Sequence, residues 1–208
     1  MLLRDIALVC VADGVVGASF GAIAVSGGQA AWVPVAMSLL VFAGGAQFAA
    51  LGVVLAGGSP LAAVAAGLVL NARLLPFGFA VADVLGPRLP SRLVGAHVIV
   101  DESVAFALAQ REHARRRAAF WTCGLMLFVV WNIAVVVGVF AGRLIGDPSA
   151  LGLDAASPVV LLALVLPSLR DGGTLRAAVV GGVIALATTP VLPPGLPVAL
   201  ALVGLVAA

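Results

Sequence analysis

The sequence predicts an all-α, polytopic membrane protein with about seven transmembrane helices, within a range of six to eight, some of them broken or re-entrant. Of its 208 residues, 63% are hydrophobic and only 10% are charged. The apolar runs are long enough to cross a hydrocarbon core of about 30 Å as helices of roughly 20 residues. They are continuously apolar, whereas strands of a membrane barrel would alternate apolar and polar residues. We therefore expect one transmembrane domain over residues 1–208.

Composition and motifs exclude several function classes. All eleven basic side chains are arginines, and the net charge of +2 is spread over connecting segments, so nucleic acid is not an expected partner. Cys10 and Cys123 lie inside apolar runs without CxxC spacing, which is typical of small packing residues. The sequence contains no HExxH, no GxSxG, no Cys–His nucleophile arrangement and no metal-ligand cluster. We expect no enzyme, no catalytic residue, no metal and no cofactor.

The first apolar run predicts a helix over about residues 5–26. It reaches a spanning length, so we expect a retained helix rather than a cleaved signal peptide. Gly14, followed by Gly17, Ala18 and Gly21, gives a small-residue stripe that favours close contact with another helix. Asp13 has two interpretations. It is either a proton-coupling carboxyl group or a structural residue that makes a capping or interhelical hydrogen bond.

Residues 32–56 and 59–84 predict a transmembrane helical hairpin with a turn between them. In the first arm, Gly44 and Gly45 precede Gln47, and glycine permits either close helix approach or a local break. An amide at membrane depth needs a partner. Gln47 therefore either joins two helices by a hydrogen bond or lines a substrate path.

The second arm carries Asn71 and Arg73 shortly before Pro76 and Gly78. An arginine near the bilayer centre costs at least ~2.5–3.5 kcal/mol on insertion scales. Arg73 is thus either a functional charge beside a helix distortion or a side chain that extends to the membrane interface. Both interpretations stay open from the sequence alone.

The run over residues 93–109 is short and is the most polar membrane segment. It contains His97, Asp101, Glu102 and Ser103. In a continuous helix His97 and Asp101, four residues apart, would share one face. An acidic pair with a histidine one turn away resembles a proton relay or a cation site. The alternative is a short interfacial helix with solvated carboxylates.

The only dense cationic cluster, residues 111–117, is expected to be a cytoplasmic loop by the positive-inside rule. About four crossings separate it from the N-terminus, which we therefore also expect to be cytoplasmic. A helix over residues 118–144 follows and buries Asn132, either as a site residue or, more simply, as an interhelical hydrogen-bonding group.

The last part of the chain predicts a helix over residues 154–169 and then an interrupted apolar run over residues 175–208. Prolines and a glycine within residues 188–197 prevent this run from forming one helix. Two short crossings or a helical hairpin are expected.

These motifs together resemble the AzlC family, the large subunit of bacterial branched-chain amino acid exporters, also called LIV-E transporters. The resemblance covers most of the chain and depends on five segments in a specific order: residues 38–50, 57–60, 70–73, 101–103, and Leu153-Asp154 with Pro158. Two positions depart from the family pattern. Leu74 stands where the family commonly has histidine, and Val15 or Val16 stands where it usually has proline.

The resemblance implies a secondary transporter that exports leucine, isoleucine or valine across the bacterial cytoplasmic membrane, driven by proton antiport. It also implies a small hydrophobic partner subunit of the AzlD type, and a homo-oligomer stays open. The alternatives are an exporter or channel for another small solute and an accessory membrane subunit without transport of its own.

A zwitterionic substrate needs donors for its carboxylate, acceptors for its ammonium group and an apolar pocket. The residues expected to bind substrate are Gly44, Gly45, Gln47, Asn71 and Arg73. Asp101 and Glu102 are expected to couple transport to protons. Asp13, His97, Ser103 and Asn132 are second-rank candidates.

Overall fold

The computed structural model describes residues 2–72, 74–144, 166, 168–192 and 196–207. All regular elements within these residues are helices, which confirms the all-α class. Within the described part of the chain, three segments are long and apolar enough to cross a membrane: Leu2–Ser26, Pro60–Ala80 and His113–Leu144. The chain divides into two compact units, one within residues 1–44 and 71–147 and the other within residues 45–70 and 148–208. Each unit is described by itself.

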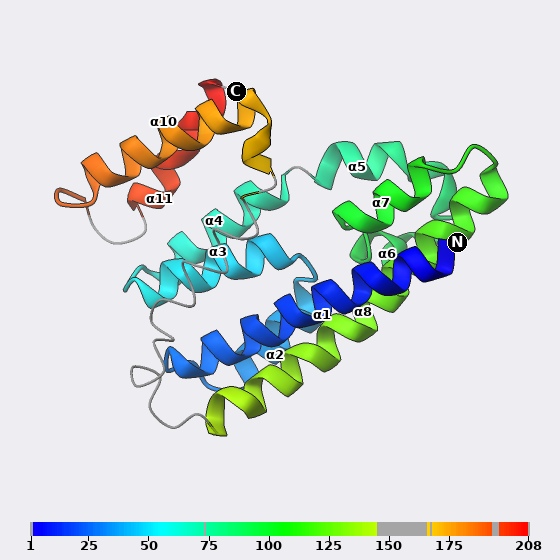
Figure 1. Ribbon diagram of the computed structural model, residues 1–208, viewed down its shortest axis with the longest axis horizontal. Coiled ribbons are helices and arrows are strands. Elements are labelled where there is room, and N and C mark those ends of the chain that lie inside the picture. Colours follow the sequence, from blue (N-terminus) through cyan, green and yellow to red (C-terminus); the bar gives the residue numbers. More distant parts are fainter. Residues whose placement is uncertain (1, 73, 145–165, 167, 193–195, 208) are drawn as a thin grey trace. The chain divides into compact units, whose positions relative to one another are not determined.

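The frame of the first unit is a pair of long helices, α1 (Leu2–Ser26) and α8 (His113–Leu144), which run side by side (Figure 1). A Cβ atom added to Gly21 would collide with the backbone carbonyl oxygen of Val135, and one added to Gly138 would collide with the backbone of Ala18. The two backbones are therefore in direct contact, which only glycine permits at these positions. The small-residue stripe predicted for the first helix is confirmed.

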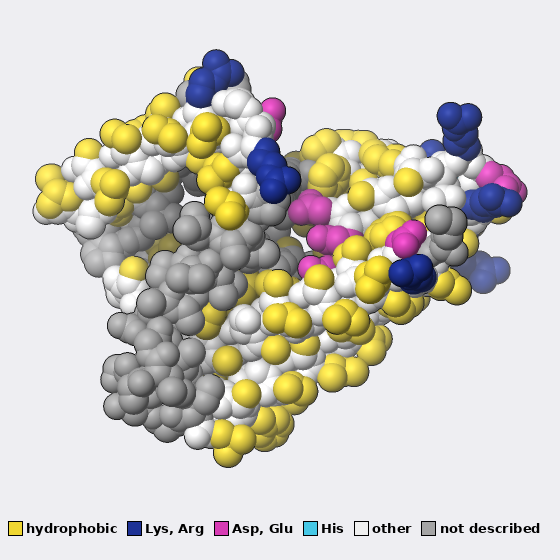
Figure 2. Space-filling model, viewed as in Figure 1, with side chains coloured by type: hydrophobic (Ala, Val, Ile, Leu, Met, Phe, Trp, Pro, Cys, Tyr) yellow, Lys and Arg dark blue, Asp and Glu magenta, His cyan; other side chains and the backbone are white. Residues whose placement is uncertain are grey.

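The outward surfaces of these two helices are apolar. Large exposed hydrophobic side chains include Leu8, Val11 and Val15 on α1 and Ile133 and Phe140 on α8. Figure 2 shows hydrophobic side chains spread along this helix pair. A helix that is apolar on its outward as well as its inward face is typical of a membrane span.

Five shorter helices complete the first unit: α2 (Trp32–Leu40), α5 (Leu74–Ala80), the 3₁₀ helix η1 (Ala82–Val84), α6 (Leu89–His97) and α7 (Asp101–Leu108). Residues of η1, α7 and α8 meet in a buried apolar cluster that includes Val84, Val104 and Phe120. Trp121 packs on this cluster, and its indole N–H donates to the carbonyl oxygen of Val84 over 3.0 Å.

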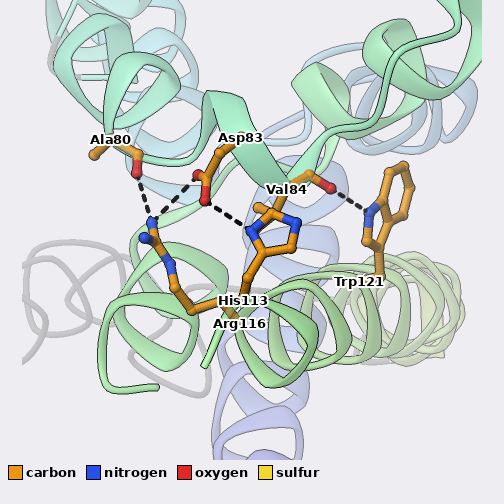
Figure 3. A network of polar contacts seen from close by, with 6 residues as sticks. All are labelled: Ala80, Asp83, Val84, His113, Arg116 and Trp121. Atoms are coloured by element: carbon orange, nitrogen blue, oxygen red, sulfur yellow. Dashed lines mark hydrogen bonds and ion pairs between the residues drawn. The ribbon is translucent and has the colours of Figure 1, made fainter. Parts of the chain in front are cut away.

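Polar contacts hold η1 against the first turn of α8 (Figure 3). Asp83 lies 3.3 Å from Nδ1 of His113, and Arg116 donates to the carbonyl oxygen of Ala80 over 2.9 Å and to Asp83 over 3.4 Å. Part of the arginine cluster is thus helical rather than a loop, because α8 begins at His113 and not near residue 118 as predicted. Arginine and alanine, which fill this stretch, are good helix formers.

The second unit contains α3 (Gly44–Leu55), α4 (Pro60–Asn71), the 3₁₀ helices η3 (Ser168–Arg170) and η4 (Leu202–Ala207), and the helices α10 (Gly172–Thr188) and α11 (Leu196–Ala201). The helices α3 and α4 share an apolar cluster around Val53 and Ala66. A Cβ atom on Gly181 would lie 2.5 Å from the carbonyl oxygen of Ala201, so α10 and α11 form a tight hairpin. The interruption and hairpin predicted for the last apolar run are confirmed.

Asp171 caps the start of α10. Its carboxylate accepts hydrogen bonds from the backbone N–H of Thr174 over 2.8 Å and from the hydroxyl of the same residue over 2.9 Å. These hydrogen bonds hold the pKa of Asp171 below its usual value. The predicted helix over residues 154–169 lies almost entirely outside the described residues, as does Arg73.

Two of the predicted segments are interrupted. The segment 32–56 forms α2 and α3, and the segment 93–109 forms α6 and α7. This agrees with the prediction that some helices are broken, and the first interruption lies directly before Gly44 and Gly45. The segment 59–84 forms α4, α5 and η1, with Arg73, between α4 and α5, outside the described residues. Paired glycines weaken the first segment, and the β-branched run at residues 98–100 weakens the other. The divisions matter because non-helical backbone at membrane depth is tolerated only inside protein or beside a wet cavity.

Replacing Gly138 by alanine should destabilise the protein, because the new methyl group collides with the backbone of Ala18. We expect the free energy of unfolding in detergent to fall by about 1–3 kcal/mol. Gly182→Ala is the matched control, since nothing described lies within 4 Å of its added Cβ atom. That variant should be neutral or more stable, by up to about 1 kcal/mol. Equal stability of the two variants would contradict the close packing of α1 and α8.

Candidate functional site: two helix breaks at an aromatic cluster

The first break separates α2 from α3. Helix α2 ends at Leu40 and α3 begins at Gly44. Within the break, the N–H of Val41 still donates to the carbonyl oxygen of Met37, and the N–H of Ala43 donates to that of Val41 over 2.6 Å. Phe42 itself is only 8% exposed. The break therefore turns its central side chain into the protein and not toward the surroundings.

The second break separates α6 from α7 and is held by one hydroxyl group. The hydroxyl of Ser103 accepts a hydrogen bond from the N–H of Val100 over 3.1 Å. Its own proton has two acceptors within reach, the carbonyl oxygens of Val98 at 2.9 Å and Val100 at 3.0 Å. Ser103 is completely buried. It thus satisfies backbone groups that the break leaves without helical partners, which gives this second-rank candidate a structural role.

The two breaks meet at three rings, which we call the aromatic cluster: Phe42, His97 and Phe128. Phe42 lies in the first break, His97 ends α6 at the second break, and Phe128 comes from the continuous helix α8. The ring centroids of Phe42 and Phe128 are 5.2 Å apart and those of His97 and Phe128 are 5.5 Å apart, both edge to face. Phe42 and His97 are 6.2 Å apart. The cluster therefore joins both breaks to one rigid helix.

Asn132 ties α8 to α2. Its side-chain oxygen accepts a hydrogen bond from the hydroxyl of Ser38 over 2.7 Å, and its amide nitrogen donates to the carbonyl oxygen of Phe128 over 2.8 Å. Ser38 is fully buried. The prediction of an interhelical hydrogen bond at Asn132 is confirmed.

Trp131 fills the space between these contacts. An added Cβ atom on Gly44 would lie 2.9 Å from Cη2 of its ring, and one on Gly17 would lie 3.3 Å from Cδ2. Gly44 is therefore needed for close approach of the chain to an aromatic ring at the place where α3 begins. A larger residue at either glycine would displace the indole.

Carboxyl groups lie beside the second break. Asp101 and Glu102 form the first turn of α7, where the positive end of the helix dipole favours a negative charge, and both are half-buried. Asp13 is half-buried on α1 and lies close enough to Glu102 for their charges to interact. His97 and Asp101 do not share a helix face as predicted, because the backbone is extended at Val100 between them. Asp13 on α1 and Glu102 on α7 therefore lie near one another.

The remaining predicted substrate residues are separated between the units. Gly45 and the fully buried Gln47 are in α3 within the second unit, whereas Asn71, the last residue of α4, is half-buried and falls within the first. Arg73 lies outside the described residues. That these residues line one site stays a prediction.

The sequence analysis missed Phe42, Phe128 and Trp131. It selected polar and charged groups at membrane depth, and aromatic residues are common in any apolar helix. The spacing of three between Phe128 and Trp131, followed directly by Asn132, does place all three on one side of a helix. That spacing was the available signal, but nothing in the sequence shows that this side faces a break.

The hydrogen bond between Ser38 and Asn132 should be measurable by a double-mutant cycle. Ser38→Ala and Asn132→Ala, alone and combined, should give a coupling of about 0.6 kcal/mol and at most ~1.7 kcal/mol in reversible unfolding in micelles. Ser91→Ala is the control partner, because its hydroxyl donates only locally, to the carbonyl oxygen of Arg88. Strict additivity of the first pair would show that the interhelical bond does not stabilise the protein.

Comparison with known proteins agrees with this architecture. The sequence model of the AzlC family, described as "AzlC protein", matches residues 9–145, which include both breaks and the whole aromatic cluster. An uncharacterized membrane protein of Archaeoglobus fulgidus is 34% identical over 154 residues, which cover 72% of this chain and 66% of the relative. No solved structure matches the chain. The chain is a membrane protein that belongs to the AzlC family.

Proposed function

We propose that this chain is a secondary transporter that exports leucine, isoleucine and valine across the bacterial cytoplasmic membrane by proton antiport. AzlC proteins are associated with transport of branched-chain amino acids, which supports the substrate class. The observation that carries the proposal is the meeting of two broken helices at the aromatic cluster. Broken membrane helices supply free backbone groups where a transporter binds its substrate.

The substrate carboxylate is held at the start of α3 and by Arg73. The first N–H groups of a helix have no partner within it, and they carry the positive end of its dipole. Gly44 and Gly45 present such groups without side chains that would obstruct a ligand. Arg73 adds a guanidinium that pairs with carboxylates in two-point geometry.

The ammonium group is held by acceptors beside the second break. Asp101 and Glu102 offer carboxylates, and the side-chain amides of Gln47 and Asn71 offer further oxygen acceptors. The rings of Phe42 and Phe128 supply apolar surface for a branched aliphatic side chain. The three parts of a zwitterionic aliphatic amino acid thereby each have a chemical counterpart.

Proton coupling follows from the same carboxyl groups. Protonation of Asp101 or Glu102 from the outside removes the negative charge that holds the ammonium group, so that proton entry releases the substrate. Asp13 on α1 is a further carboxyl group near Glu102. His97, the last residue of α6, lies at the same helix break and is a further candidate for proton exchange.

The topology consists of about seven crossings, of which two are built from two short helices each. A helix such as α2 or α6, with 9 residues, is too short to cross the bilayer by itself. Joined with α3 and α7 respectively, each completes a broken crossing. The positive-inside rule places the N-terminus and residues 111–117 in the cytoplasm.

The functional unit includes a small hydrophobic subunit of the AzlD type, and it can also contain more than one copy of this chain. A second candidate is an exporter of another small amphipathic solute. The specific observation in its favour is Leu74, where the family commonly has histidine. A non-transporting accessory subunit is the third possibility, in which the polar residues serve only helix contacts.

Counterflow in liposomes tests the proposal. Purified chain, with and without an AzlD-type subunit, should take up labelled leucine against internal unlabelled leucine, and excess valine or isoleucine should suppress that uptake. Suppression by an unrelated solute instead would favour the second candidate. Absence of leucine uptake in every combination, with the protein correctly inserted, would contradict transport by this chain.

Asp101→Asn and Glu102→Gln should separate exchange from coupling. We expect at least one of these variants to retain leucine counterflow but to lose uptake driven by an imposed pH gradient, because a neutral amide carries no proton. Glu112→Gln is the matched control. Its carboxylate is exposed and pairs with Arg115 over 3.0 Å, away from both breaks. Normal gradient-driven uptake by both Asp101 and Glu102 variants would remove them from the coupling mechanism.

A further inference from the structure

Trp131 carries a buried hydrogen-bond donor that the fold does not use. Its side chain is only 6% exposed, and its indole Nε1 has no hydrogen-bond partner among the residues that the structure describes. The indole of Trp121, on the same helix, donates to the carbonyl oxygen of Val84. A buried N–H without a partner is costly and is rare in folded proteins. Trp131 therefore differs from an ordinary core tryptophan.

The position of this indole is as informative as its missing partner. Phe128, Trp131 and Asn132 lie on one side of α8 because they are three and four residues apart. Each contacts the first break or its borders. Phe128 meets Phe42, Trp131 meets Gly44, and Asn132 binds Ser38. The ring that carries the free donor is thus part of the surface of α8 that faces the end of α2 and the beginning of α3.

Packing alone does not require the donor. A fused ring of the same size without an N–H group, such as benzothiophene, would fill the space beside Gly17 and Gly44 equally well. The cost of the indole N–H is offset when a ligand accepts its hydrogen bond. An unused donor at a helix break therefore indicates a ligand group with a free lone pair.

Hydrogen-bond chemistry selects which part of the ligand this is. An indole N–H is a donor only. The ammonium group of an amino acid has no lone pair to accept it, and an aliphatic side chain has none either. Only the carboxylate accepts. The N–H of Gly44, at the positive end of α3 and beside the same ring, favours the same negative group.

We propose that Trp131 is a further substrate-binding residue, whose indole N–H donates a hydrogen bond to the carboxylate of the transported amino acid. This inference rests on the proposed function and extends it to a residue that binds the carboxylate from α8. Trp131, where α8 meets the first break, would then determine that the transported solute must carry a free carboxylate.

Binding of leucine to the purified, detergent-solubilised chain tests the inference. Trp131→Phe should weaken leucine binding by roughly tenfold or more, as expected for a lost hydrogen bond to a charged group. Trp121→Phe is the matched control, since it removes a chemically identical donor that is already used within the fold. The control should bind leucine as the unaltered protein does.

A ligand without a carboxylate identifies the group that Trp131 contacts. Isoamylamine keeps the ammonium group and the branched side chain of leucine but has no carboxylate. Its inhibition constant against labelled leucine should be the same for the unaltered protein and for Trp131→Phe. If both ligands weaken equally, the effect of the substitution is general and the carboxylate assignment is overturned.

A side chain of nearly the same size and shape as tryptophan serves as the control for misfolding of the variant. 3-Benzothienylalanine at position 131 keeps the size and shape of the indole but has sulfur in place of the N–H. It should weaken leucine binding as phenylalanine does. Unchanged leucine affinity in this protein would overturn the inference while leaving the proposed function intact. Failure of the unaltered protein to bind leucine, valine or isoleucine would overturn the proposed function, and the inference with it.

Discussion

The direct backbone contact between α1 and α8 is the constraint on which the first unit depends. Because Gly21 and Gly138 have no side chains, the two helices approach closely enough to hold α8 in one position. Other residues of α8, among them Phe128, Trp131 and Asn132, contact the first break and its borders. A continuous helix fixed on one side can position interrupted helices on the other. Interrupted helices alone would expose backbone groups that lipid cannot satisfy.

The two breaks differ in how their backbone N–H and C=O groups find hydrogen-bond partners. At the second break, the Ser103 hydroxyl replaces helical partners for the backbone between His97 and Asp101. At the first break, Gly44, the first residue of α3, lies beside the Trp131 ring. The first break is therefore the better place for an anionic ligand group. The carboxyl groups of α7 lie at the other break. In the proposed function, the carboxylate and the ammonium group of the substrate are therefore bound by different helices.

The sequence predicts the long apolar helices and the glycine stripe well, because both depend on local composition and spacing. It also predicts the interhelical role of Asn132 and the C-terminal hairpin. It predicts that some helices are broken and offers a local break at Gly44 and Gly45, but it does not locate the break at residues 98–100. Val98, Ile99 and Val100 are as compatible with a membrane helix as their neighbours, and the break is supported by tertiary contacts, among them the Ser103 hydrogen bonds and the packing of Val98 against Gly124. Aromatic residues of the site were missed because polarity was the search criterion, and Trp131 becomes informative only when its N–H is seen without a partner.

The most direct test of this account is protection of the two breaks by substrate. Single cysteines at Ala43, Val100 and, as a control on the outward face of α8, Val137 would be introduced into a protein whose Cys10 and Cys123 are replaced by alanine. The rate of reaction with a small thiol reagent would be measured with and without saturating leucine. The account predicts that leucine slows the reaction at residues 43 and 100 and leaves residue 137 unchanged. Unchanged rates at both breaks, in a protein that still exchanges leucine, would place the substrate site elsewhere.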